Sequence, residues 1–180
     1  MELSDDEPTL VYFSGTTTDE CDAWKNAVRQ LKGHVATKRV RGSRVAEGVR
    51  STPQFILYFP PDNGIRRRLV YPNGPTVSAQ NLADFARGHH CVLFHMKGCG
   101  HCDDMMPEWK AFTSTSIPSV TVADYQWTNS KHLPDRVIQS FEVDGFPTVV
   151  HVSPEGKVTL FKGAERTAQY FTRFVKQQTV

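Results

Sequence analysis

Apolar and polar residues in the second half of the chain follow the spacings of short buried strands and amphipathic helices. Residues 90–96 form an apolar run that ends in Lys-Gly, and residues 100–112 carry apolar side chains at intervals of three and four. Combined with the Gly and Pro turn signals, this pattern predicts the order β α β α β β α. The predicted elements are strands at 90–96, 119–125, 148–152 and 158–161, and helices at 100–112, 134–141 and 168–176.

The first half repeats this order in a shorter form, as expected of an internal repeat. Cys21 and Cys102 are 81 residues apart, whereas Pro53 and Pro147 are 94 apart, so the first copy lacks 13 residues near its middle helix. Its predicted elements are strands at 10–14, 34–40, 55–59 and 65–71, helices at 19–31 and 78–86, a turn at 60–64 and at most a short helix at 44–49. The repeat predicts two α/β domains, 9–88 and 89–180, behind an acidic tail, 1–8.

The composition is that of a globular protein, with 39% hydrophobic and 22% charged residues. The apolar runs are too short to span a bilayer, and the acidic start lacks the apolar region of a signal peptide. We therefore expect no membrane span and a cytoplasmic protein; the alternative is an oxidising secretory compartment, if a signal has been removed. Four cysteines are too few for a disulfide framework, which makes a cysteine pair a candidate for catalysis or metal binding.

The net charge of +2 conceals a basic first half. Between residues 8 and 88 there are twelve Lys and Arg but only six Asp and Glu, and the Arg66-Arg67-Arg68 run belongs to this excess. One interpretation is a solvated face that the acidic tail partly neutralises, and another is a patch for an acidic protein partner. Nucleic acid is disfavoured as a partner, because the total charge is low and no nucleic-acid motif is present.

The segment Cys99-Gly100-His101-Cys102 stands at the predicted junction of a strand and a helix. A helix N-terminus stabilises a thiolate, so we assign Cys99 as the nucleophile and Cys102, one turn further on, as the resolving thiol of a redox-active disulfide. His101 can place a positive charge near the Cys99 thiolate, which would make the pair more oxidising. A zinc site is the alternative, but the histidines nearby lack a ligand spacing, and we expect neither a metal nor a cofactor.

These features together resemble the active domains of protein disulfide isomerases, which have a CGHC motif, a proline five residues beyond it and a cis-proline before a strand. Here the counterparts are Cys99–Cys102, Pro107 and Gly145-Phe146-Pro147-Thr148. The resemblance covers residues 89–178 well and residues 9–87 as a degenerate copy. It implies two tandem thioredoxin-fold domains, each a central mixed β-sheet flanked by helices, and a thiol–disulfide oxidoreductase that forms, reduces or rearranges protein disulfides.

The resemblance also implies roles for residues around the cysteine pair. Pro147 should be cis and face the cysteines, the backbone of Phe146 should pair with substrate peptide, and Gly98 should border the same substrate site. Arg166 is a candidate for tuning the pKa of Cys102.

The chain departs from the family at Leu93, where a buried glutamate usually accepts the proton of the second cysteine, and at Gly98, where the family usually has Trp. The proton of Cys102 would then pass to water or to another group. The candidates are Asp103, Asp104 and His95, all of which we expect to be solvated.

In the first copy, the position of the motif reads Thr18-Asp19-Glu20-Cys21, which excludes dithiol chemistry there. The resemblance implies that this domain binds substrates or partners. We expect Cys21 to be an inert thiol packed against its helix, or half of an occasional bridge. Cys91 is expected in the core, and His89-His90 in an exposed link between the domains.

The expected partners are protein thiols and disulfides, with a flavin-linked sulfhydryl oxidase or a thioredoxin reductase upstream. Two alternatives stay open, a thioredoxin-type reductase and a non-enzymatic binding or scaffold module.

Overall fold

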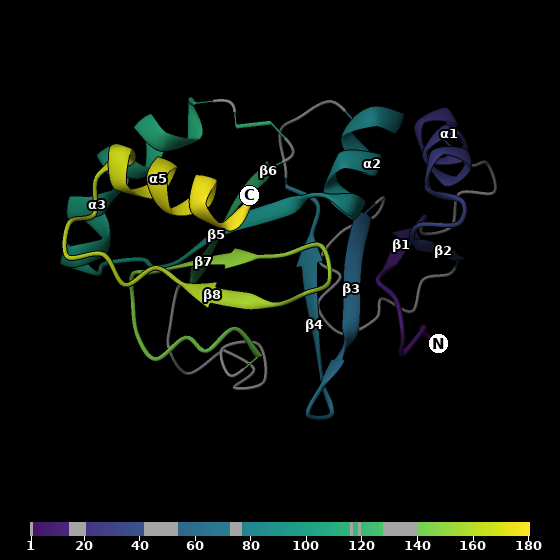
Figure 1. The fold of residues 1–180 in the computed structure, drawn as a ribbon, viewed down its shortest axis with the longest axis horizontal. Helices are drawn as coiled ribbons and strands as arrows, with labels where there is room; N and C mark the ends of the chain where they lie inside the picture. The colour runs from purple at the N-terminus through teal and green to yellow at the C-terminus, as the bar shows by residue number, and fades with distance from the viewer. Residues whose placement is uncertain are drawn as a thin grey trace. The chain divides into compact units, whose positions relative to one another are not determined.

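The computed structural model describes residues 2–14, 21–41, 54–72, 77–115, 117–118, 120–127 and 140–180 (Figure 1). The chain divides into two compact units, unit 1 with Met1–Gly88 and Pro154–Gly156, and unit 2 with His89–Ser153 and Lys157–Val180. Several predictions lie outside the described residues: the helix at 44–49, most of the helix at 134–141, Pro53, and the segment Thr18-Asp19-Glu20.

Unit 1 contains one four-stranded sheet in the order β2-β1-β3-β4. The central strand β1 is parallel to β2 and antiparallel to β3, and β4 lies antiparallel at the edge. Two helices complete the described part of the unit. The elements are β1 (Thr9–Phe13), α1 (Asp22–Leu31), β2 (Ala36–Val40), β3 (Gln54–Asp62), β4 (Ile65–Val70) and α2 (Ala79–Arg87).

Helices α1 and α2 pack on one face of this sheet through aromatic side chains. Trp24 of α1 lies with its ring centroid 5.4 Å from that of Tyr12, and Phe85 of α2 lies 5.3 Å from Tyr71. The start of α2 is fixed by Ser78, whose hydroxyl accepts the backbone N–H of Asn81 at 3.1 Å. The predicted helix starting at residue 19 instead begins at Asp22, because Cys21 has an extended backbone and occupies the N-cap.

The turn predicted over 60–64 is present but shorter than predicted. Strand β3 continues through Pro60 and Pro61 to Asp62. The chain reverses at Asn63 and Gly64, whose φ angles are 51° and 76°. Asn-Gly suits a two-residue hairpin in which both residues need positive φ. The prolines, which cannot donate to the ladder, fall at a register shift between Tyr58 and Pro61, where the pairing is already interrupted.

Unit 2 has a sheet of the same connectivity, in the order β6-β5-β7-β8. Its first strand, β5, is central, parallel to β6 and antiparallel to β7, and β8 is again an antiparallel edge strand. The elements are β5 (His89–Met96), α3 (Gly100–Thr113), β6 (Val120–Trp127), β7 (Thr148–Val152), β8 (Val158–Leu160) and α5 (Ala168–Gln178). The predicted elements of this half that lie within the described residues are confirmed to within two residues at each end.

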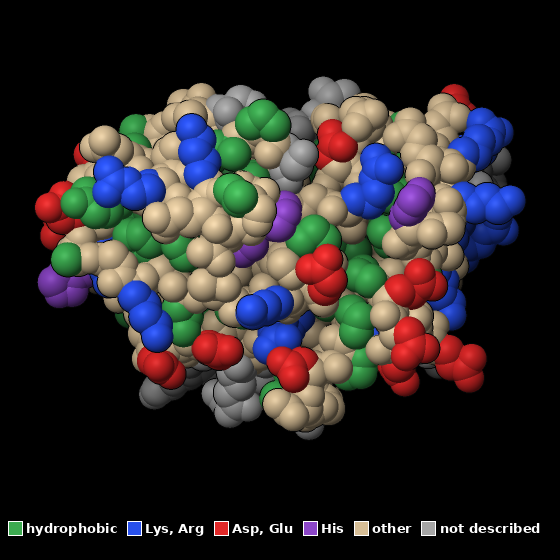
Figure 2. Space-filling view, viewed as in Figure 1, with side chains coloured by type: hydrophobic (Ala, Val, Ile, Leu, Met, Phe, Trp, Pro, Cys, Tyr) green, Lys and Arg blue, Asp and Glu red, His purple; other side chains and the backbone are tan. Residues whose placement is uncertain are grey.

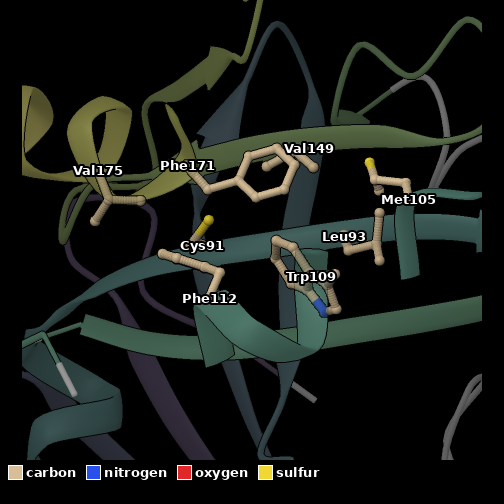
Figure 3. Close-up of a cluster of buried hydrophobic side chains, with 8 residues drawn as sticks. All are labelled: Cys91, Leu93, Met105, Trp109, Phe112, Val149, Phe171 and Val175. Carbon is tan, nitrogen blue, oxygen red and sulfur yellow. The ribbon is translucent and has the colours of Figure 1, made fainter. Parts of the chain in front are cut away.

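Helices α3 and α5 pack together over the sheet of unit 2 (Figure 3). Phe171 of α5 stands between the helices, 5.7 Å from Trp109 and 5.8 Å from Phe112 by ring centroids. Glu108 of α3 accepts the backbone N–H of Ala168 at 2.8 Å and so anchors the start of α5. Truncating any one of these buried aromatic rings would cost about 3–5 kcal/mol. This packing fixes α3, and with it the cysteine motif, on the sheet.

Candidate thiol–disulfide active site

Cys99 is the N-cap residue of α3, and Cys102 lies in the first turn of that helix. The backbone N–H groups of Cys102 and Asp103 donate to the Cys99 carbonyl at 2.9 and 3.0 Å, which closes the turn. Strand β5 reaches the helix through a tight turn in which Gly98 has φ of 77°, a conformation that favours glycine. Cys99 is partly exposed, whereas Cys102 is 1% exposed, so the two thiols differ sharply in access.

The loop before β7 brings a second element to Cys99. The Phe146–Pro147 peptide bond is cis, as predicted, and Pro147 is buried. The Cys99 thiol donates a weak hydrogen bond to the Phe146 carbonyl, with 3.8 Å between Sγ and O. Thr148 closes the loop by donating its hydroxyl to the Gly145 carbonyl at 2.7 Å. The structure therefore brings Cys99 together with Phe146 and Pro147, which follow it by 47 and 48 residues in sequence.

The environment of Cys102 favours its protonated form. Burial raises the pKa of this thiol to about 11, and its hydrogen bond with Cys99 and the nearby charges of Cys99 and Asp103 act in the same direction. A backbone hydrogen bond from Met96 opposes them. The Cys102 thiol is therefore protonated at neutral pH. Both cysteines are free thiols in the structure.

His95 differs from its expected place in solvent. It is 6% exposed, and its Nε2 lies 3.1 Å from Oδ2 of Asp124 on β6. In a strand, alternate residues share a face, so His95 projects to the same side as Leu93, which packs in the core beneath α3. His95 also directly precedes Met96, whose backbone contacts the Cys102 thiol. The other two proton-acceptor candidates, Asp103 and Asp104, are exposed as expected.

Asp124 is a residue that the sequence reasoning missed. A carboxylate inside the strand predicted at 119–125 was the available signal, because a charge is unusual in a strand paired to a buried neighbour. Its partner could not be identified without the pairing of the strands, which places Leu93 opposite Asp124 and His95 beside it.

His101 and Arg166 are both exposed. In the described part of the chain, no hydrogen bond joins His101 to either cysteine, so its effect on the Cys99 thiolate stays a prediction. Arg166 lies in the loop before α5 and is not among the groups that shift the pKa of Cys102. Its tuning role also stays a prediction.

Two of the minor expectations need correction. Cys21 is exposed at the N-cap of α1 and is not packed against the helix. His89 and His90 belong to β5, and His90 is 1% exposed, so the pair is not an exposed link. The strand continues upstream of its predicted start because both histidines pair with β6. Cys91 is buried as predicted, and burial raises the pKa of its thiol.

The histidines near the start of β5 form a cluster with His151 of β7. His89 Nδ1 lies 2.9 Å from His151 Nε2, and the ring of Phe174 packs edge-on against His151. Burial, followed by the charge of His89, lowers the pKa of His151 to about 4. Burial, followed by the charges of His151 and His89, lowers the pKa of His90 to about 3. Within the described ranges, no three His, Cys, Asp or Glu side chains gather as a metal site.

The thioredoxin family profile matches residues 77–177, which is more than half of the chain. The protein therefore belongs to the thioredoxin family. Curated relatives include a protein disulfide-isomerase of Zea mays, 33% identical over 106 residues (56% of this chain, 20% of that protein). Another is the protein disulfide isomerase-like 1-1 of Arabidopsis thaliana, 33% identical over 109 residues (58% of this chain, 21% of that protein). The chain thus spans about a fifth of the length of these relatives.

Among solved structures, the first thioredoxin domain of mouse protein disulfide-isomerase A4 is 20% identical, with a TM-score of 0.47 over 77% of this chain and 89% of that domain. Full-length ERdj5 is 15% identical, with a TM-score of 0.41 over 97% of this chain and 30% of that one. No described helix is long and apolar enough to cross a membrane.

Proposed function

We propose that this protein is a thiol–disulfide oxidoreductase of the protein disulfide isomerase type, with Cys99 and Cys102 as its redox-active pair. The observation that carries the proposal is the asymmetry of the two thiols. Cys99 is accessible at a helix N-terminus and faces the Phe146 carbonyl, whereas Cys102 is buried one turn further on and held protonated. An accessible nucleophile with a protected second thiol in reach is what a two-step exchange requires.

In the reducing direction, the Cys99 thiolate attacks one sulfur of a substrate disulfide. A bond forms between Cys99 and that sulfur, the substrate disulfide breaks, and the other substrate sulfur leaves as a thiolate that takes up a proton. Cys102 then loses its proton and attacks Cys99. The Cys99–Cys102 disulfide forms, the second substrate thiol is released, and two electrons have passed to the substrate. The oxidising direction reverses these steps, and isomerisation stops at the mixed disulfide.

The second step needs an acceptor for the Cys102 proton, and we assign this role to His95. The Asp124 carboxylate can only accept, so the His95 ring donates to it from Nε2, and in the neutral form of such a ring Nδ1 is an acceptor. His95 is buried on the face of β5 that carries α3, next to the residue that contacts Cys102. No hydrogen bond joins Cys102 to His95 in the part of the chain that the structure describes, so we propose that the proton passes to His95 through water. Leu93 leaves no carboxylate at the position where the related enzymes have one.

The Phe146 carbonyl is the proposed acceptor for the backbone of a substrate peptide. It accepts from the Cys99 thiol in the free protein, and it loses that donor once Cys99 is ionised or bonded to substrate sulfur. An extended peptide beside the Pro147 loop could then donate its N–H in place of the thiol. Gly98, which is exposed and has no side chain, leaves the approach to Cys99 open.

Unit 1 is the proposed second, inactive thioredoxin-like domain, with a role in substrate or partner binding. Support comes from the two sheets, which share their strand order and the direction of every pairing. By sequence alignment the nucleophile position of unit 1 is Thr18, and Cys21, the thiol at the N-cap of α1, is followed three residues later by Trp24, so the unit has no dithiol of its own. The upstream partner is a sulfhydryl oxidase if the protein works as an oxidase, and a thioredoxin reductase if it works as a reductase. The cytoplasmic location stays a prediction.

Reduction of insulin and reactivation of scrambled ribonuclease test the proposed activity. We expect wild-type protein to catalyse both reactions, Cys99→Ala to be inactive, and Cys102→Ala to keep partial isomerase activity. Cys21→Ala is the matched control, because Cys21 is also an exposed thiol at a helix N-cap but has Trp24 where a second cysteine would stand. Full activity of Cys99→Ala would contradict the proposed role of Cys99, and an inactive wild-type protein would favour a non-enzymatic binding or scaffold module.

A further inference from the structure

The sheet of unit 1 has a second face, opposite the one that α1 and α2 cover. Its buried cluster consists of Val11, Phe13, Ile56 and Tyr58. The partly buried hydrophobic residues that pack against this cluster in the described ranges are Val40 of β2, Val70 of β4 and Leu3. Of these, Leu3 lies outside the sheet, in the N-terminal segment Glu2–Glu7, which we call the strap.

The same face carries positive charge along two strands. Lys38 of β2 pairs in register with Val11, and Arg68 of β4 pairs with Tyr58, so both project to the side of the cluster. Arg66 precedes Arg68 by two residues and shares its face. Together with the four cluster residues, Lys38, Arg66 and Arg68 form what we call the basic face of unit 1.

The strap binds the basic face through an apolar contact and through charge. Leu3 packs against the cluster, and Arg66 forms an ion pair with the Asp5 carboxylate. Arg66 also donates to the Ser4 carbonyl at 2.7 Å, and Lys38 donates to the Glu2 carbonyl at 2.8 Å. Acidic side chains gather in Figure 2 around the place where Figure 1 marks the N-terminus. The tail thus neutralises part of the basic excess seen in the sequence.

The charged contact of the strap is weak. The four acidic residues of the strap are exposed, and Asp5, the partner of Arg66, keeps 75% of its side chain accessible. An ion pair so exposed contributes little and is screened by salt. Ser4 accepts the N–H groups of Asp6 and Glu7, which shapes the strap itself and does not tie it to the sheet. The strap can therefore leave while the sheet stays intact, and its departure uncovers an apolar strip beside three cations.

We infer that the basic face of unit 1 is a docking surface for an acidic, leucine-bearing segment of a partner protein, and that the strap is a built-in competitor for it. The inference rests on the partner-binding role proposed for unit 1 and is independent of the cysteine chemistry. The strap itself shows the required chemistry, an aliphatic side chain for the cluster followed by a carboxylate for Arg66. A partner must displace the strap before it binds. The apparent affinity of the partner is therefore its affinity for the open protein multiplied by the fraction of molecules in which the strap is released.

A fluorescein-labelled peptide with the sequence of residues 1–8 is the probe, and fluorescence anisotropy is the readout. We expect a variant that lacks residues 2–7 to bind the peptide at least about tenfold more tightly than the intact protein, which has to open first. Raising the salt concentration should weaken binding, as should Arg66→Glu in the shortened variant. A peptide with Asp in place of Leu3 is the control for the apolar contact and should bind poorly. Should the deletion impair folding, the full-length Leu3→Asp variant loosens the strap without shortening the chain.

The inference is overturned if the shortened and intact proteins bind the peptide equally, or if neither binds. Equal binding of the Asp-substituted peptide, or tighter binding of a single-stranded oligonucleotide, would also overturn it, as would self-association of the shortened variant. Insulin reduction by the same variants is a separate readout. Retained reduction without peptide binding would refute the docking surface alone, whereas peptide binding without reduction would refute the proposed chemistry alone.

Discussion

The Cys99 thiol lies 3.8 Å from the carbonyl oxygen of Phe146, the residue that precedes the cis Pro147. This contact joins the start of α3 to the loop before β7. The thiol occupies a backbone hydrogen-bond acceptor at the point where the substrate sulfur has to arrive. Reaction at Cys99 removes the thiol proton and frees that acceptor. The same atom that starts the exchange therefore also controls access to the proposed peptide contact.

Replacing His101 should change the reduction potential of the Cys99–Cys102 pair. A positive charge on His101 would stabilise the Cys99 thiolate and so the reduced form, which raises the potential above the value of about −270 mV found in thioredoxin. We expect His101→Ala to lower it by about 30 mV, or tenfold in the equilibrium constant. The measurement is a titration against glutathione buffers. His34→Ala, an exposed histidine of unit 1, is the control, and an unchanged potential in His101→Ala would exclude this role.

His95→Phe should slow the release of substrate by Cys102 and change its pH dependence. A general base contributes about 10²–10⁴ in rate, so we expect a loss of at least about a hundredfold at pH 7. Without His95 the rate should rise with pH until the Cys102 thiol ionises by itself, near its pKa of about 11. The wild-type rate should depend less steeply on pH, because a base in the site accepts the proton of Cys102. Stopped-flow release of glutathione from a preformed Cys99 mixed disulfide measures this step.

Phe retains the ring volume of His95, which limits the disturbance of the core. Asp124→Asn is a second test of the role of His95. It keeps a hydrogen-bond partner for the ring but removes the charge that orients it, so the rate of substrate release should fall less than in His95→Phe. Identical pH profiles for wild type and His95→Phe would show that water alone accepts the Cys102 proton.

His151 should make unit 2 sensitive to acid. Its pKa is about 4 in the folded state and ordinarily 6.5, so the unfolded chain binds a proton that the folded chain does not between these values. Its contribution to stability is present above pH 6.5 and is lost as the pH falls toward 4. The free energy of unfolding of wild type should fall between pH 7.5 and 4.5, and we expect this decrease to be smaller by about 2 kcal/mol in His151→Gln. Urea unfolding measures both values. The exposed His34→Gln should lose as much as wild type, and a parallel loss in His151→Gln would refute the assignment.

Much of the fold was accessible from the sequence because its strands are apolar runs and its helices have a clear apolar face. Residues 148–152 and the helix from Ala168 lie where the pattern predicts them. The turn of the hairpin in unit 1 was predicted too long because Pro60 and Pro61 are strong turn signals, yet a register shift accommodates them in β3 and Asn63-Gly64 makes the turn. A local signal could not show that the prolines fall at an interrupted part of the ladder.

The cysteine pair and the cis Pro147 could be located from the sequence because their spacing is distinctive. The surroundings of the pair could not, since His95 and Asp124 meet only through the parallel pairing of β5 with β6. The burial of His90 and His95 could not be predicted either. A strand covered on both faces shows no alternation of apolar and polar residues, so the pattern does not tell which face a histidine is on or whether it is buried. Both histidines were therefore expected in solvent.

The proposed chemistry requires that the Cys99 sulfur bonds to substrate and that the Cys102 sulfur releases it. Cys102→Ala should trap substrate in a mixed disulfide, which can be seen with reduced Cys102→Ala protein incubated with insulin, alkylated and analysed by peptide mass spectrometry. We expect the substrate sulfur to be attached to Cys99, with Cys21 and Cys91 unmodified by substrate, and we expect Cys99→Ala to trap almost none. Attachment at Cys21, or equal trapping by Cys99→Ala, would contradict the assignment of the nucleophile.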